Sequence, residues 1–426
     1  MAGALNLKYP HAFSGLIAIL LTLGILALGT LYAQSLEQQY VHLLAPLMLP
    51  QSINGIALQQ AGLQQPDLLM VYGASEMLVE DVPTKIKYGQ SIISVPGTSY
   101  GASQFFKDEP SGFGVYEIAA FGAPSLSVAQ DLAAIGPELR GKKVVISLTP
   151  SIFLFEKRAL LSDYLVDYSS LHANALIFDP YLSLTTKTIA AHSMNNYPSI
   201  LTEDPILQFA VQQLNCKCRT GRYGYYLIWP LGQLRIWIIR LQDHWEALNL
   251  IRNYPKVNTP MVRKPTPIDW SAEISQAQSL QKTYSNNNPY GIENEVWSAY
   301  YSTRLADPKK PGSADYGFTH NLNTSGEWID LDLMLRVLKE MGAQPLIVSR
   351  PLSGPIWDTM GVSEHARSRY YSKLHNVVSI YGFPVVDFAD HDSDVYFCTD
   401  AYSHASRMGW VYVDLTLDEF FHGKIH

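Results

Sequence analysis

The chain has 426 residues, of which 47% are hydrophobic and 16% are charged, and its formal net charge is −7. This length is enough for one large folded domain or two smaller ones. Because the chain is acidic and has no basic footprint, we expect no function that depends on binding nucleic acid.

The three cysteines are Cys216, Cys218 and Cys398. Cys216 and Cys218 are separated by one residue, which is too close for an unstrained disulfide. Too few other ligands surround them for a zinc site. The sequence therefore predicts no metal and no cofactor, and it leaves the pairing of the cysteines open.

The N-terminal part predicts a membrane anchor. Residues 1–12 contain Lys8, and the stretch from Phe13 to Ala33 has no charged residue. About 20 apolar residues are enough for a helix to cross a bilayer, and the basic flank places residues 1–12 in the cytoplasm. The alternative is a signal peptide cleaved near Ala33. Residues 34–66 are rich in Gln and Leu and predict a stalk, which leaves residues 67–426 as the extracytoplasmic domain.

The first part of that domain has short apolar runs that are typical of strands. They are Leu68 to Tyr72, Ser91 to Val95, Tyr116 to Phe121 and Lys143 to Leu148. A helix with one apolar face is expected from a cap at Ser125 to its stop at Gly136.

From about residue 155 to residue 325 the alternation is lost, and helical segments with aromatic clusters dominate. We interpret this stretch as a helical insertion that caps the sheet. Its run from Tyr225 to Ile239 is apolar but contains Pro230 and Arg235. We therefore expect an interfacial or core helix there, and not a second membrane crossing.

Alternation of helices and strands returns after the insertion. The predicted elements are a helix from Glu327 to Met341, a strand from Pro345 to Ser349, a helix capped by Ser363, and a strand from Pro384 to Phe388. Strands that alternate with helices pair in parallel. We therefore predict an α/β fold with a doubly wound, mostly parallel sheet.

Two segments contain candidate catalytic groups. Ser75 directly follows the first predicted strand, and Asp400 and His404 lie close together near the C-terminus. Taken singly, Ser75 next to Glu76 is typical of a turn or a helix start, and an Asp near a His is usually a surface pair. In a parallel sheet, however, residues that follow strands meet at one edge. A histidine held by a carboxylate there can serve as the general base for a serine.

An ordered set of motifs resembles the DltD family, whose core is similar to that of the SGNH hydrolases. The matching positions are Gly73-Ala74-Ser75-Glu76, Gly101-Ala102-Ser103-Gln104, Leu148-Thr149-Pro150-Ser151, Phe153, Tyr370-Tyr371, Gly382-Phe383, Asp387-Phe388, Tyr396-Phe397, Asp400, His404, Gly409-Trp410 and Val413-Asp414. The resemblance covers most of the chain, and it is weakest in the middle.

The resemblance implies a triad of Ser75, His404 and Asp400, with Gly101 and Gln104 in oxyanion or substrate binding. The family spaces its acid and base as D-x-x-H, whereas three residues separate Asp400 from His404 here. Asp394 is the alternative acid.

The resemblance also implies a function. It indicates a membrane-anchored serine acyltransferase or esterase of a D-alanylation pathway, which acts on a polyol-phosphate polymer such as lipoteichoic acid. Implied partners are a membrane O-acyltransferase and, as a further possibility, a D-alanyl carrier protein. Two alternatives stay open: a noncatalytic membrane-anchored adaptor, and a hydrolase that removes acyl groups from the envelope. The acceptor polymer and the oligomeric state are not predicted.

Overall fold

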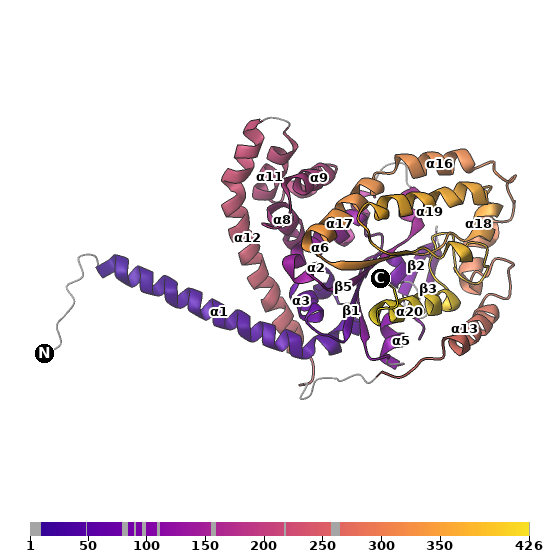
Figure 1. The fold of residues 1–426 in the computed structure, drawn as a ribbon, viewed down its shortest axis with the longest axis horizontal. Coiled ribbons are helices and arrows are strands. Elements are labelled where there is room, and N and C mark those ends of the chain that lie inside the picture. Colours follow the sequence, from indigo (N-terminus) through magenta and orange to yellow (C-terminus); the bar gives the residue numbers. More distant parts are fainter. Residues whose placement is uncertain are drawn as a thin grey trace.

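A computed structural model describes residues 10–47, 49–78, 84–88, 91–95, 99–108, 111–154, 159–216, 219–256 and 265–425. A five-stranded sheet lies at its centre (Figure 1), in the order β4-β1-β5-β6-β7. The strands are β1 (Leu68–Gly73), β4 (Gly114–Ala119), β5 (Lys143–Leu148), β6 (Gln344–Ser349) and β7 (Val385–Val386). Each strand pairs in parallel with its neighbours. The predicted α/β fold with a parallel sheet is therefore confirmed.

Alternate residues of β1 enter two separate cores on the two faces of the sheet. Met70 and Tyr72 pack in one core, and Leu69 and Val71 pack in the other. This alternation follows from the period of two residues in a strand. The first face is covered by α6 (Ser125–Ile135), α17 (Glu327–Met341) and α19 (Glu364–Ser379), and the second by α5 (Ala102–Asp108), α13 (Trp270–Tyr284) and α20 (Arg407–Phe421).

The two helices predicted after the insertion have the predicted caps. Gly342 ends α17 with a left-handed φ of 74°. The side chain of Ser363 accepts a hydrogen bond from the Ala366 N–H at 3.2 Å and so caps α19, which follows α18 (Gly354–Thr359). At α6 the cap differs, because Pro124 is the N-cap residue and Ser125 is already helical.

The run from Ser91 to Val95 forms a strand, but this strand is not part of the central sheet. It is β3, which pairs antiparallel with β2 (Thr84–Tyr88) in a separate two-stranded sheet. The two lysines of β2 leave it without the apolar run by which the other strands were predicted, so the sequence does not predict the hairpin.

The described part of the long connection between β5 and β6 is mostly helical, as predicted, but its helices pack in two different places. Its helices before α13 are α7 (Leu161–Val166), α8 (Ser170–Phe178), α9 (Leu184–Met194), α10 (Pro198–Leu201), α11 (Pro205–Asn215) and α12 (Arg219–Ile251). In Figure 1, α8, α9, α11 and α12 form a lobe on the side of α6. In contrast, α13 packs against α20 on the opposite face, and α14 (Asn294–Val296), α15 (Ser302–Arg304) and α16 (Asp315–Thr324) follow it.

The N-terminal helix α1 (Pro10–Leu44) projects from the body (Figure 1). Among the described residues it is the one helix that is long and apolar enough to cross a membrane, and only 6% of its most apolar window is buried. Lys8 lies outside the described residues. Residues 34–66, which we expected as a stalk, form the end of α1, α2 (Pro50–Asn54) and α3 (Ala57–Leu63), and Leu44 and Leu58 are buried in the first core.

Two of the cysteines are described. Cys216 is disulfide-bonded, and Cys398 is a free, buried thiol. Burial raises the pKa of the Cys398 thiol well above its usual value, so this thiol stays protonated.

Candidate active site

Ser75 stands at the carboxyl edge of the central sheet. It begins the short helix α4 (Ser75–Leu78), directly after β1 and Ala74. The neighbours of β1 are β4 on one side and β5 on the other, so the chain order reverses there. Ligands of doubly wound sheets bind in the crevice at such a switch point. The fold therefore places the serine hydroxyl at the position where this type of sheet has room for a substrate.

The turn before Ser75 is tight and is held from within. A Cβ added to Gly73 would lie 2.6 Å from Glu76 Oε1 and 2.7 Å from Met77 Cγ, so a larger residue there would displace these side chains. The buried Glu76 carboxylate accepts a hydrogen bond from the Ala74 N–H at 2.9 Å. The nearby buried guanidinium of Arg350 donates to Met77 Sδ at 3.4 Å. Glu76 thus helps to hold the turn in shape.

Asp400 and His404 form a hydrogen-bonded pair. His404 Nδ1 lies 2.6 Å from Asp400 Oδ2, and the Asp400 side chain is fully buried. The other oxygen, Oδ1, accepts hydrogen bonds from the N–H groups of Tyr402 at 2.8 Å and His404 at 3.2 Å. The three intervening residues therefore do not separate the acid from the base, because the carboxylate folds over its own turn.

Backbone conformation makes this turn possible. Ser403 has a φ of 68°, in the left-handed region, and the Thr399 N–H donates to the His404 carbonyl at 2.9 Å. Tyr301 Oη accepts a hydrogen bond from the Ala401 N–H at 3.0 Å. The left-handed conformation of Ser403 and these hydrogen bonds allow the turn to accommodate three residues between acid and base, one more than in the family spacing.

The two segments meet at the serine. His404 Nε2 lies 3.0 Å from Ser75 Oγ. When Nδ1 donates its proton to Asp400, the neutral ring presents its unprotonated Nε2 to the serine hydroxyl. The alternative acid, Asp394, contacts His391 instead, at 3.5 Å from Nδ1. The arrangement has the geometry of an activated serine nucleophile.

Two opposing effects act on the pKa of His404. Burial of the ring would lower this pKa, and the Asp400 carboxylate raises it. Burial is the largest single effect, but the charge and hydrogen bond of Asp400, together with the charge of Glu76, outweigh it, and the pKa lies above the usual value for histidine. The imidazolium that forms when His404 takes a proton is therefore stabilised by its partner.

A cavity of about 160 Å³ adjoins the triad. Its lining residues are Ala74, Ser75, Gly122, Pro124, Thr149, Ser151, Ile152, Ala159, Asp163, Glu327, Tyr402 and His404. Thr149 Oγ1 donates to the Tyr402 carbonyl at 2.6 Å, which ties the segment after β5 to the histidine loop. Among the described lining residues, Asp163 and Glu327 are acidic, and none is Lys or Arg.

The predicted pair Gly101 and Gln104 does not line this cavity. Gly101 precedes α5 and its carbonyl accepts from the Phe105 N–H at 2.7 Å, and the Gln104 amide donates to Asp108. Their assignment to oxyanion or substrate binding stays a prediction.

Sequence reasoning missed the two acidic lining residues. Asp163 is on α7, inside the connection interpreted as a cap, and Glu327 is the first residue of α17. Glu327 Oε2 accepts a hydrogen bond from the Ser125 N–H at 3.1 Å. A sequence signal for Glu327 was its place at the start of a helix, but nothing in the sequence placed it beside Ser75.

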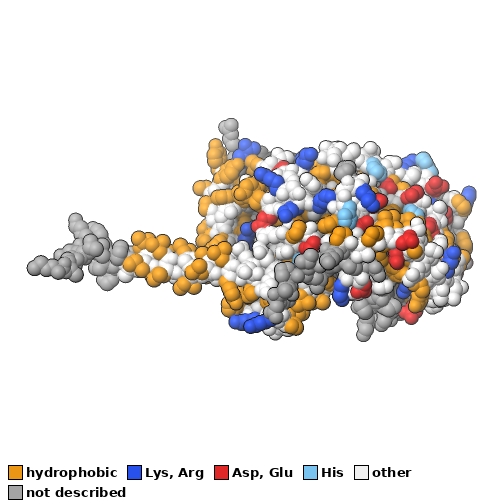
Figure 2. Space-filling model, turned by 60° about the horizontal axis from the view of Figure 1, so that its bottom comes forward, with side chains coloured by type: hydrophobic (Ala, Val, Ile, Leu, Met, Phe, Trp, Pro, Cys, Tyr) orange, Lys and Arg blue, Asp and Glu red, His pale blue; other side chains and the backbone are white. Residues whose placement is uncertain are grey.

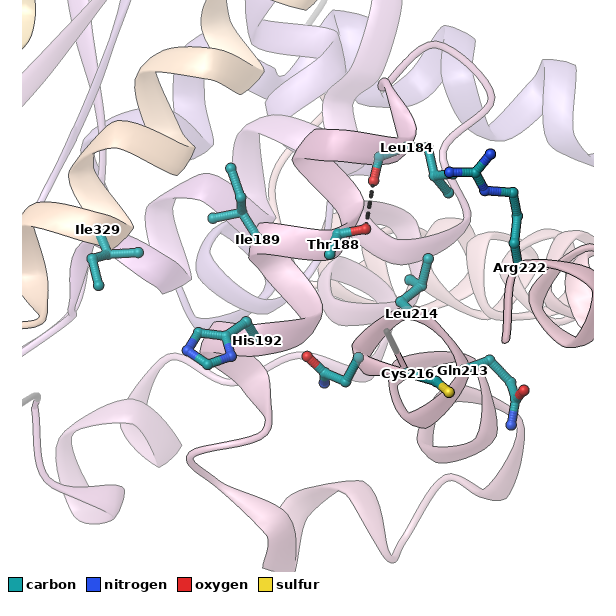
Figure 3. Close-up of a pocket in the computed structure, with 10 residues that line it drawn as sticks. Leu184, Thr188, Ile189, His192, Gln213, Leu214, Cys216, Arg222 and Ile329 are labelled. Carbon is teal, nitrogen blue, oxygen red and sulfur yellow. Dashed lines mark hydrogen bonds between the residues drawn. The ribbon is translucent and has the colours of Figure 1, made fainter. Parts of the chain in front are cut away.

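A second, larger cavity of about 640 Å³ lies in the lobe of helices (Figure 3). Its lining includes His192, Gln213, Cys216, Arg222 and Ile329 and no residue of the triad. Within the described ranges, no three His, Cys, Asp or Glu side chains gather as metal ligands would.

Comparison with known proteins identifies the family. The family model described as "DltD protein" matches residues 45–422. Protein DltD of Bacillus subtilis is 25% identical over 377 residues, which cover 88% of each chain. Protein DltD of Staphylococcus aureus is 24% identical over 339 residues, which cover 76% of this chain and 81% of the relative. With a match over most of its length, the chain belongs to the DltD family.

Proposed function

We propose that this chain is a membrane-anchored serine acyltransferase that transfers D-alanine to a teichoic-acid-like envelope polymer. The DltD family takes part in the D-alanylation of teichoic acids. The main observation that supports this chemistry is a chain of two hydrogen bonds. His404 Nδ1 lies 2.6 Å from Asp400 Oδ2, and His404 Nε2 lies 3.0 Å from Ser75 Oγ.

In the first half of the reaction, His404 Nε2 takes the proton of Ser75 Oγ as that oxygen attacks the carbonyl carbon of a D-alanyl ester or thioester. The tetrahedral intermediate then collapses, the bond to the leaving group breaks, and His404 returns the proton to that group. The Ser75 N–H is our candidate donor to the oxyanion. The product of this half is a D-alanyl ester on Ser75.

In the second half, a hydroxyl of the polymer takes the place of the leaving group. His404 removes the proton of this hydroxyl, the oxygen attacks the ester carbonyl, and Ser75 Oγ leaves with the proton that His404 returns. Asp400 keeps the ring in one tautomer throughout and stabilises its positive charge. The enzyme is unchanged at the end, and no cofactor is consumed.

The charge of the cavity supports D-alanine as the acyl group. A D-alanyl ester carries an ammonium group two bonds from its carbonyl carbon. The acidic side chains of Asp163 and Glu327 line the cavity beside Ser75, and none of the lining residues that the structure describes is Lys or Arg. Opposite charges in a partly buried site attract strongly enough to select a cationic acyl group over a neutral one.

We further propose that the body lies outside the cytoplasm, with α1 as a single membrane span. A membrane O-acyltransferase and a D-alanyl carrier protein are the proposed partners. They would supply the activated acyl group at the membrane, and the polyol-phosphate polymer would accept it.

A fluorophosphonate probe tests the nucleophile directly. Full-length protein should be labelled at Ser75, because the probe reacts with activated serines and not with ordinary ones. The matched control is Ser151→Ala, which removes another serine of the same cavity. Loss of label in Ser75→Ala with full label in Ser151→Ala supports the proposal. An unlabelled wild-type protein would favour the noncatalytic adaptor.

Product analysis separates transfer from hydrolysis. With a D-alanyl thioester as donor and a polyglycerol phosphate as acceptor, we expect D-alanyl ester on the polymer. Release of free D-alanine at the same rate with and without polymer would instead indicate the hydrolase.

A further inference from the structure

The outward face of α12 is apolar along most of its length. Its exposed side chains include Leu227 at 80%, Tyr223 at 65% and Trp245 at 60%. The outer stripe consists of Tyr223, Tyr226, Leu227, Pro230, Leu231, Leu234, Trp237, Ile238 and Trp245. Successive members are one to seven residues apart, so they follow one side of the helix. A helix that faces water on this side would carry polar residues there.

The inward face of α12 is fixed against the lobe, so the outer stripe cannot turn inward. Tyr225 is buried, and its hydroxyl donates to the Ile177 carbonyl at 2.9 Å. A Cβ at Gly232 would lie 2.4 Å from the ring of Phe178. The Asp243 carboxylate accepts the Ile56 and Ala57 N–H groups at 2.8 Å each. These contacts set the rotation of the helix about its axis.

The C-terminal end of the stripe, at Trp245, lies next to the membrane span. A groove of about 430 Å³ lies between the two helices, lined from Ile25 to Leu36 on α1 and from Leu241 to Arg252 on α12. His244 Nδ1 contacts Glu37 at 2.8 Å and ties α12 to α1. In Figure 1 the rest of α12 runs at a steep angle to α1. If α1 crosses the bilayer, a helix at such an angle to it runs along the bilayer surface.

The chemistry of the stripe fits lipid. It contains Tyr and Trp, which prefer the boundary between headgroups and hydrocarbon, together with aliphatic side chains. None of its members is charged. Figure 2 shows hydrophobic side chains both along α1 and on the adjoining end of the body. From Tyr223 to Trp245 the helix extends about 33 Å. An apolar stripe of this length is unusually long for a surface that faces water.

We propose that α12 is an interfacial helix that lies on the surface of the bilayer crossed by α1, with its outer stripe among the lipids. The span and the helix then hold the body at two places. One span alone would allow the body to tilt freely, whereas two contacts fix which side of the body faces the membrane.

A lipid-quenching experiment tests this arrangement in the full chain. Leu234→Cys, on the stripe, and Tyr316→Cys, on α16, are both exposed positions, at 51% and 83%. Each variant receives an environment-sensitive nitrobenzoxadiazole dye and is placed in nanodiscs of phosphatidylcholine and phosphatidylglycerol with doxyl lipids. We expect the dye at residue 234 to be quenched roughly fivefold more than the dye at residue 316, because only the first reaches the lipid.

Two references make the result decisive. Wild-type protein labelled in parallel measures any reaction of the buried Cys398 thiol. Leu20→Cys, 58% exposed on α1, reports on the span itself. If residue 20 is quenched and residue 234 behaves like residue 316, the inference is wrong, and the stripe is left for a protein partner or for water. If residue 20 is not quenched, the membrane span on which the inference rests is wrong.

Discussion

The two halves of the triad are held by different kinds of structure. Ser75 follows a strand that pairs in parallel on both of its sides, and its turn is braced by Glu76. His404 and Asp400 lie in a loop without a named strand, and they are held by bonds within the turn and by Tyr301. The nucleophile is thus positioned by the sheet, whereas the acid and base position each other. Mutations should therefore affect the two halves differently.

The largest expected effect is at Ser75. Ser75→Ala should lower D-alanyl transfer by about 10⁶-fold, measured as kcat, because it removes the attacking oxygen. The fold should change by less than about 1 kcal/mol in unfolding free energy, because the side chain is small and only half-buried. His404→Ala should give a similar loss of activity, and the double variant should be no worse, because the two groups act as a unit.

The next effect is at the acid. Asp400→Asn should lower kcat by about 10⁴-fold, because the amide favours the wrong tautomer of His404. Asp394→Asn is the matched control and should retain activity within a few-fold, because Asp394 contacts His391. Should Asp394→Asn abolish transfer while Asp400→Asn leaves it intact, the acid has been assigned to the wrong residue.

The pH dependence reports on the same pair. Since the Asp400 carboxylate raises the pKa of His404, kcat/KM should fall on the acid side with an apparent pKa above the usual value of about 6.5. His404 must be neutral to accept the proton of Ser75, so activity rises with pH through this value. The stabilisation from the charged pair has the opposite dependence. It is fully present below about pH 6.5 and is lost as the pH rises through the higher folded pKa. A stability profile without this loss would contradict the proposed pairing.

The smallest effect concerns the turn itself. Ser403→Val should destabilise the protein by about 1–2 kcal/mol, because a β-branched residue disfavours the left-handed φ of 68°. Ser403→Gly should be neutral or slightly stabilising at this φ. Both variants lack the hydroxyl, but only valine is strained at this φ. The difference between their thermal unfolding curves therefore measures the backbone strain. Equal destabilisation by the two would mean that the hydroxyl and not the backbone holds the loop.

The sequence predicted the parts of the fold whose pattern is local. The bounds predicted for the fourth strand and for the helix from Glu327 to Met341 are those of β5 and α17. Both elements have one clear period of apolar residues and a clear stop. The antiparallel hairpin was missed because its first strand alternates Lys with apolar residues and lies outside the βα pattern. The helices between β5 and β6 pack in two different places. This division depends on tertiary contacts, which no local sequence pattern predicts.

The same division applies to the candidate site. Ser75, Asp400 and His404 were predicted from motif positions, and the structure brings these three together. The extra residue between Asp400 and His404 argued against their pairing in the sequence. The left-handed conformation of Ser403, which allows the pairing, cannot be predicted from a serine in a polar segment. Asp163 and Glu327 reach the cavity from helices that are distant in sequence, so no local pattern indicates that they lie beside Ser75.

Intact-protein mass spectrometry of an acyl-enzyme tests the central claim most directly. Full-length protein in nanodiscs is mixed with a D-alanyl thioester and no acceptor, then quenched in acid and compared with Ser75→Ala. We predict that the wild-type protein gains the mass of one D-alanyl group, which peptide mapping assigns to Ser75, and that adding polyglycerol phosphate removes it. A wild-type protein that gains no such mass, or that gains it equally in Ser75→Ala, would contradict the account.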